Sequence, residues 1–238
     1  MRNSSRAIAV FCCGWALLSA SPEGRAAAPE RRIDVYVTPY YQSATSPNGT
    51  PHVAVGGEFD RLLSSNNPKD IVAARDLAAG NPALVTPMTM MVLSIRLYDV
   101  GQRDESVFWF YAAKYRYFTL RAVLNTNAAM FGSVDDTIHS FATLAGPYVN
   151  GYAFCDVNKQ QKLEAKAIDW VEQHPYAVLF NSALPATPGD RNANLKDSIA
   201  KLRAAFRQEG DFLRDPANIA TMKQSHKAND TDSKFCWR

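Results

Sequence analysis

The clearest local group of side chains that could carry out chemistry consists of Asp135, Asp136 and His139. Spacings of three and four residues place them on one side of a helix, where they can share a metal ion or a proton. A plainer interpretation is an exposed helix start, because carboxylates near an N-terminus interact favourably with the helix dipole. We prefer this second interpretation. An exported hydrolase that uses the three residues remains the enzymatic alternative.

Sequence signatures of common enzymes are missing from the chain. It contains no Gly-x-Ser-x-Gly elbow, no His-Glu-x-x-His zinc helix, no phosphate-binding loop and no dinucleotide-binding glycine fingerprint. We therefore expect a protein that is not an enzyme and that needs neither a cofactor nor a metal ion.

The cysteines predict a cross-link. Cys12 and Cys13 lie in an N-terminal apolar run, so only Cys155 and Cys236 remain in the rest of the chain. One pair permits one intramolecular connectivity. A loop of this span would contribute about 4 to 5 kcal/mol to stability in the chain-entropy model. We predict a Cys155–Cys236 disulfide formed in an oxidising compartment, with two free buried thiols as the alternative.

The N-terminus has the layout of a secretory signal peptide. Arg2 and Arg6 precede an apolar run from Ala7 to Leu18, and small residues follow. We assign residues 1–28 to the signal, with cleavage near Ala28 or, alternatively, after Ala20. The run is shorter than the roughly 20 residues that span a bilayer, so we expect no stable membrane anchor. A periplasmic or secreted location follows from this interpretation.

The charge of the chain depends largely on this segment. The full sequence has 26 basic and 23 acidic residues, a net charge of +3. Removing residues 1–28 takes away three arginines and Glu23, which leaves 23 basic and 22 acidic residues and a net charge of +1. This near-neutral balance gives no support for a nucleic-acid partner or an anionic membrane surface. About 210 residues remain, enough for one sizeable core.

The pattern of apolar residues predicts an all-α fold of antiparallel helical hairpins. Residues 29–57 read as a short extended arm or loop, in which Ile33 to Val37 alternate as a short strand would. Residues 58–238 form the helical domain, with a break or kink near Gly146-Pro147 and a polar, mobile tail after Lys223 except where Cys236 pins it. Helical spacing and end signals place a short helix from Glu58 onward, with Phe59, Leu62 and Leu63 on one face, and further helices at 68–80, 87–100, 104–124, 134–154, 159–174 and 195–208.

Two of these helices carry a family resemblance. Residues 97–101, Leu-Tyr-Asp-Val-Gly, end one helix, and residues 109–113, Trp-Phe-Tyr-Ala-Ala, lie in the next. These pieces resemble a tetratricopeptide-like helical repeat, over about one repeat. By size, compartment and this hairpin, the chain resembles the periplasmic immunity proteins that neutralise phospholipase effectors delivered by type VI secretion. The resemblance implies stoichiometric binding to another exported protein, such as a toxic effector.

The second helix of this pair is aromatic on almost every side, so it must bury more than one face. It is either the central helix of the domain or, on one side, a protein-binding surface, because Trp, Tyr and Arg are favoured interface anchors. The candidate partner-binding residues are Trp109, Arg116, Tyr117 and Arg121. A cell-envelope scaffold or assembly factor would use such a surface equally well, and is the alternative within the binding class.

Overall fold

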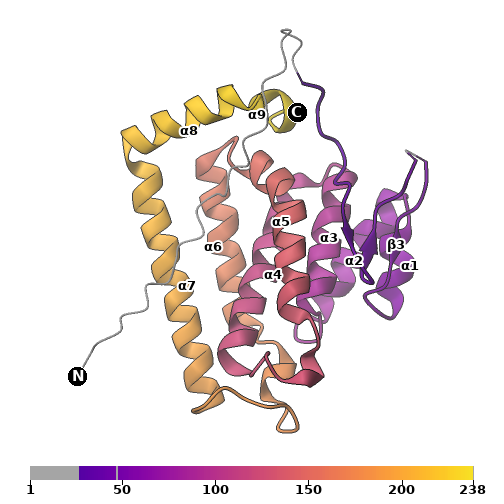
Figure 1. The fold of residues 1–238 in the computed structure, drawn as a ribbon, viewed down its shortest axis with the longest axis vertical. Helices are drawn as coiled ribbons and strands as arrows, with labels where there is room; N and C mark the ends of the chain where they lie inside the picture. Colours follow the sequence, from indigo (N-terminus) through magenta and orange to yellow (C-terminus); the bar gives the residue numbers. More distant parts are fainter. Residues whose placement is uncertain (1–26, 47, 238) are drawn as a thin grey trace.

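The computed structural model describes residues 27–46 and 48–237, which fold into a helical bundle beside a very small sheet (Figure 1). The predicted all-α class is confirmed. The predicted signal peptide lies almost entirely outside the described residues. The strands are β1 (Tyr36–Val37), β2 (Tyr41–Gln42) and β3 (His52–Val53). The helices are α1 (Glu58–Ser64), α2 (Pro68–Gly80), α3 (Pro87–Asp99), α4 (Arg103–Val123), α5 (Val134–Ala153), α6 (Val157–Gln173), α7 (Arg191–Arg214), α8 (Pro216–Ala228) and α9 (Thr231–Phe235), with short 3-10 helices η1 (Ala129–Phe131) and η2 (Ala177–Phe180).

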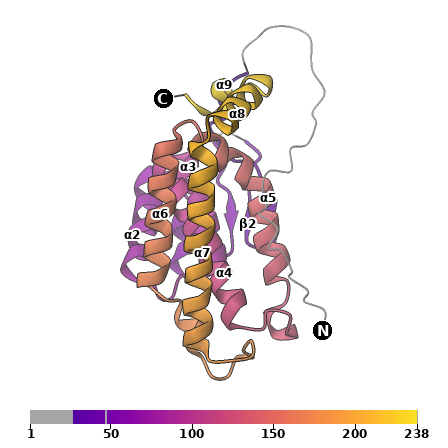
Figure 2. The same ribbon diagram turned by 90° about the vertical axis from the view of Figure 1, so that its left-hand side faces the viewer.

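Helix α4 is the centre of the bundle. It packs against α3, α5, α6 and α7, and the views in Figures 1 and 2 show these helices arranged around it. Its apolar side chains therefore meet neighbours on several sides, and Val107, Phe108 and Ala112 are all buried. A helix that is apolar around most of its circumference is stable in water only in such a position.

Helix ends follow the local signals in the sequence. The side chains of Asn67 and Thr86 accept hydrogen bonds from the amides of Lys69 and Thr89, and a proline begins each of these two helices. Gly101 ends α3 with a φ of 82°, a conformation that favours glycine. The α3–α4 connection is therefore short, and the predicted helical hairpin is present.

The extended arm, residues 29–57, is packed on the bundle. Its strands form an antiparallel sheet in the order β1-β2-β3. The predicted strand at Ile33 to Val37 is reduced to the pair Tyr36–Val37, but Ile33, Val35 and Val37 still alternate into the core with 4% exposure or less. The arm and the helices consequently share one hydrophobic core.

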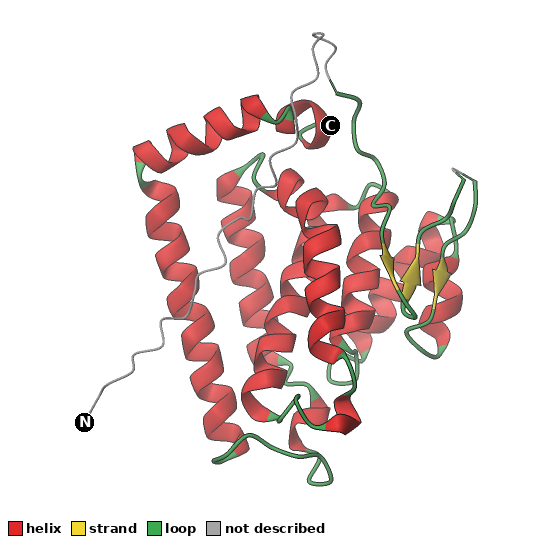
Figure 3. Cartoon of the chain, in the orientation of Figure 1, coloured by secondary structure: helices red, strands yellow, loops and turns green. Residues whose placement is uncertain are grey.

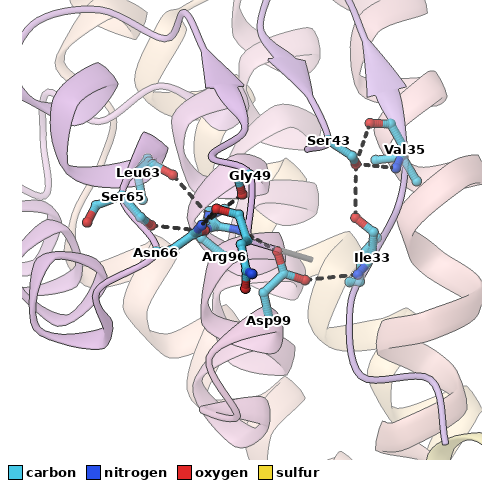
Figure 4. A network of polar contacts seen from close by, with 10 residues as sticks. Ile33, Val35, Ser43, Gly49, Leu63, Ser65, Asn66, Arg96 and Asp99 are labelled. Atoms are coloured by element: carbon cyan, nitrogen blue, oxygen red, sulfur yellow. Dashed lines mark hydrogen bonds and ion pairs between the residues drawn. The ribbon is translucent and has the colours of Figure 1, made fainter. Parts of the chain in front are cut away.

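A buried ion pair on α3 fastens the arm to the helices (Figure 4). Arg96 Nη1 lies 2.5 Å from Asp99 Oδ2, and both side chains are at most 4% exposed. Asp99 Oδ1 accepts a 2.9 Å hydrogen bond from the Ile33 amide. Arg96 also donates to the carbonyl oxygens of Leu63 and Ser65. Burial raises the pKa of Asp99 to about 6 against the opposing effect of Arg96.

The C-terminal region is polar, as predicted, but it is helical where a mobile tail was expected. Residues 216–235 form α8 and α9, which continue from the end of α7 and cross one end of the bundle (Figure 3). Asp215 explains the turn into α8, because its side chain accepts from the Ala217 amide and Pro216 begins the helix. Helix α5 continues through Pro147, so of the predicted break or kink at Gly146-Pro147 the break is absent.

Helices long and apolar enough to cross a bilayer were sought throughout residues 27–46 and 48–237, and none was found there.

Candidate functional site

Three of the four predicted partner-binding residues are buried. Trp109, Arg116 and Tyr117 are 2%, 1% and 7% exposed, so the prediction that they form an exposed surface is wrong. The reason is the central position of α4, whose neighbours cover the sides on which these residues lie. Arg121 is different, since its side chain is 54% exposed at the C-terminal end of the helix.

Arg116 has a structural role, because its guanidinium group connects three segments of the chain. Its Nη1 atom donates to the carbonyl oxygens of Pro82 and Val85 at 2.6 and 2.7 Å, and its Nη2 atom donates to the His174 carbonyl at 2.8 Å. The guanidinium also lies 4.6 Å from the ring centroid of Trp170. Burial lowers the pKa of Arg116 to about 10. This side chain therefore joins the α2–α3 connection, α4 and the end of α6.

The predicted acid–base group lies at the first turn of α5 but does not form a shared site. Asp135 Oδ2 contacts Arg121 Nε at 3.4 Å and accepts from the Thr126 hydroxyl at 3.2 Å. Asp136 and His139 are exposed. No cluster of three or more His, Cys, Asp or Glu within the described ranges could hold a metal ion. These contacts match the plainer interpretation, an acidic helix start.

One strip of α4 remains open to solvent. Lys114, Phe118 and Arg121, which we call the α4 stripe, follow each other at helical spacings of four and three residues. Phe118 is 40% exposed, although α4 buries Phe108, Tyr111 and most of its other aromatic residues. The stripe thus places an aromatic ring between two cationic side chains. Sequence reasoning missed Phe118 as a surface residue, because an all-round aromatic helix gives no sign of which side is open.

The ends of the α4 stripe lie near acidic groups on neighbouring helices. Arg121 contacts Asp135 on α5. Lys114 lies close enough to Glu209 on α7 to oppose the rise in the pKa of that carboxyl group. The stripe is therefore bordered by α5 on one side and α7 on the other, and its cations are partly balanced within the chain.

A pair of carboxyl groups, Glu164 and the partly buried Glu209, lies on the adjoining side of α4, and the sequence analysis did not identify it. Glu164 on α6 is 4% exposed and accepts a hydrogen bond from the Tyr115 hydroxyl. The Gln160 amide nitrogen lies 2.7 Å from Glu164 Oε2, 3.1 Å from Glu209 Oε1 and 3.2 Å from the Tyr111 hydroxyl. Helices α4, α6 and α7 are thus connected through one polar cluster.

The surroundings of Glu209 in this cluster favour the protonated form of its carboxyl group. Burial, followed by the charge of Glu164, raises the pKa of Glu209 from 4.5 to about 7. Burial and the same charge also raise the pKa of Tyr115. A carboxyl group of this kind can give up or accept a proton near neutral pH. The hydrogen bond from Gln160 on α6 to Glu209 on α7 indicates that Glu209 helps to dock α7.

One sequence signal was available for part of this cluster. Gln160 and Glu164 recur at the spacing of Ala167 and Val171, which are buried on α6. Polar residues in phase with a buried apolar face indicate an internal hydrogen-bonded group. Glu209, which accepts from Gln160, is 49 positions further along the chain than Gln160, and no local pattern connects the two.

The predicted disulfide is confirmed. Cys155, just after α5, is bonded to Cys236, just after α9, with a Cα–Cα distance of 5.5 Å. Arg103 reinforces this connection by donating to the carbonyl oxygens of Phe235 and Trp237. Its guanidinium lies 3.8 Å from the ring centroid of Trp237 and 4.3 Å from that of Tyr152. The C-terminus is therefore held covalently, by hydrogen bonds and by cation–π contacts.

Comparison with known proteins places the chain beside one bacterial relative. It is 36% identical over 210 residues to an uncharacterized protein of Haemophilus influenzae (strain ATCC 51907 / DSM 11121 / KW20 / Rd), and the alignment covers 88% of this chain and 80% of that protein. No family model and no solved structure matches the sequence. This degree of identity over most of both chains shows that the protein belongs to the same family as the Haemophilus influenzae protein.

Proposed function

We propose that this protein is an exported protein-binding domain, and specifically a periplasmic immunity protein that neutralises a toxic effector by stoichiometric binding. The observation that carries the proposal is the α4 stripe, in which Phe118 stays 40% exposed between Lys114 and Arg121 on a helix whose other aromatic side chains are buried. Exposed aromatic and arginine side chains on a rigid support are typical interface anchors. Such an inhibitor needs a surface and no catalytic group.

The surroundings of the stripe support this proposal. Helix α4 is held in place on two sides. Arg116 donates to carbonyl oxygens of the α2–α3 connection, and the Tyr115 hydroxyl donates to Glu164 on α6. A surface on such a helix loses little conformational entropy when a partner binds. The disulfide supports export, because such bonds persist mainly in oxidising compartments.

The proposed partner is another exported protein with an apolar pocket for Phe118 and acceptor groups near its rim for Lys114 and Arg121. Because Arg121 already contacts Asp135, we expect most of the affinity to come from the aromatic anchor and less from long-range attraction. The proposal therefore predicts weak dependence of the association rate on salt concentration.

The test combines capture and titration. The disulfide-bonded protein is used to capture partners from an envelope extract, and the captured protein is purified and titrated by calorimetry. Phe118→Ala is expected to weaken binding by about 1 to 3 kcal/mol, or roughly 5- to 150-fold in Kd. Phe212→Ala is the matched control, since Phe212 is an exposed phenylalanine on α7 and should leave Kd unchanged.

Deleting the gene separates an immunity protein from an assembly factor. Loss of an immunity protein should poison only cells that carry the active toxin. An envelope defect without any toxin would instead identify an assembly factor. The binding proposal fails if Phe118→Ala and Phe212→Ala bind the captured protein equally well, or if the protein turns over a small molecule and has no saturable protein partner.

A further inference from the structure

A cavity of about 420 Å³ lies away from the α4 stripe and is bordered by the α5–α6 turn, the end of α7, α8 and α9. Phe154 and Val157 line it from the α5–α6 turn, and Ile219 and Met222 line it from α8. Its volume falls within the roughly 300–1,000 Å³ of small-molecule sites. None of the residues of the α4 stripe lines it.

Helix α8 directs an amphipathic stripe into this space. Ile219, Met222, Lys223 and His226 line the cavity and recur at spacings of three, one and three residues, so they share one side of the helix. Such a stripe ordinarily packs onto a core. Here Ile219 and Met222 are only partly buried, and α8 contributes no buried residue to the core of the described chain.

The position of α8 over the cavity is fixed at both ends. Asp215 caps its N-terminus next to α7. Its other end leads into α9, which the Cys155–Cys236 disulfide attaches to the α5–α6 turn, and Cys155 itself lines the cavity. The disulfide thus closes a covalent loop that includes α8, and the cavity lies against this loop.

The charges in the lining define what the site can accept. His226 Nδ1 lies 3.3 Å from Asp232 Oδ1, so the one carboxylate in the lining already faces the imidazole. Lys223 has no ion-pair partner among residues 27–46 and 48–237. The cavity therefore has a mixed lining, in which apolar side chains such as Ile219 and Met222 lie beside polar groups and the ammonium group of Lys223.

We propose that this cavity binds a small amphipathic anion, an acyl chain with a carboxylate head group. The chain would cover Phe154, Ile219 and Met222, which removes apolar surface from water, and the carboxylate would pair with Lys223. This site is independent of the α4 stripe, so either proposal can fail alone.

Calorimetric titration of the disulfide-bonded protein with decanoate tests the proposal. We expect saturable 1:1 binding with a Kd of roughly 10–500 µM. Decanol, which keeps the chain, and acetate, which keeps the charge, should both bind at least about tenfold more weakly. Absence of saturable decanoate binding below its micellar concentration would overturn the site, and equal binding of decanol would overturn the role of the ammonium group.

Variants on one helix locate the site. Lys223→Glu should weaken decanoate binding at least about tenfold, whereas Lys227→Glu, an exposed residue outside the lining, should leave Kd unchanged. Met222→Trp should abolish binding by occupying the cavity, with circular dichroism confirming that the helices remain. Equal effects of the two lysine variants, or unchanged binding in Met222→Trp, would place decanoate elsewhere and refute the proposal.

Discussion

Replacing Glu209 with glutamine directly tests the pairing of the Glu164 and Glu209 carboxyl groups. In the folded protein the pKa of Glu209 is raised from 4.5 to about 7, mainly by burial. The unfolded chain therefore releases this proton near pH 4.5, while the folded protein keeps it until about pH 7. The stabilisation from the bound proton is complete below pH 4.5 and is lost as the pH rises to about 7.

The size of the effect follows from the same pKa values. A rise from 4.5 to about 7 corresponds to at most about 3 kcal/mol of stability lost between those pH values. Glu209 is only partly buried, so solvent screening reduces our expectation to about 1 to 2 kcal/mol. Glutamine cannot ionise, keeps an oxygen that can accept from the Gln160 amide, and supplies a donor that can face Glu164.

We therefore expect Glu209→Gln to match the wild-type protein near pH 4.5 and to exceed its free energy of unfolding by about 1 to 2 kcal/mol at pH 8. Urea denaturation with the disulfide intact, followed by circular dichroism at several pH values, gives the difference directly. Comparing variant with wild type removes the separate pH dependence of Asp99, whose pKa is raised to about 6. Glu58→Gln, at an exposed carboxyl group, is the control and should change stability by less than about 0.5 kcal/mol. A difference that does not vary with pH, or a variant that is less stable at pH 8, would refute the reasoning.

Three further variants, each compared with a control, test other parts of the structure. Cys155→Ser with Cys236→Ser should lower the free energy of unfolding by about 4 kcal/mol, measured by chemical denaturation, because it releases a cross-link over a sequence separation of 81; equal stability of oxidised and reduced wild-type protein would contradict this. Arg116→Lys should cost about 2 to 4 kcal/mol by the same method, since carbonyl oxygens of Pro82, Val85 and His174 lose donors, whereas exposed Arg121→Lys should cost less than about 1 kcal/mol. Gly151→Ala should destabilise docking of α9 despite alanine's higher helix propensity, because its Cβ would lie 2.5 Å from the Phe235 ring. Faster proteolysis near the C-terminus is the expected readout, and Gly80→Ala, where the new Cβ meets nothing within 4 Å, is the control that should leave the rate unchanged.

Local features of this protein were predictable because their causes are local. The caps at Asn67 and Thr86 depend on side chains that reach amides two or three residues away. Gly101 ends α3 because its own backbone adopts a positive φ. The disulfide was predictable for a different reason, since only one pair of cysteines remains outside the N-terminal apolar run.

The tertiary structure alone decided which side of each element faces solvent. Helix α4 carries aromatic residues on almost every side, so its periodicity could not separate buried Trp109 and Tyr117 from exposed Phe118; the positions of α3, α5, α6 and α7 made that separation. Glu164 and Glu209 come together only when α7 docks beside α6. The cavity under α8 likewise requires the disulfide and four separate segments. The spacing of hydrophobic residues indicates that a helix face is buried, but which element covers that face depends on long-range packing. This is why helices α1 to α7 were predictable from the sequence, whereas the polar helices α8 and α9 and the candidate sites were not.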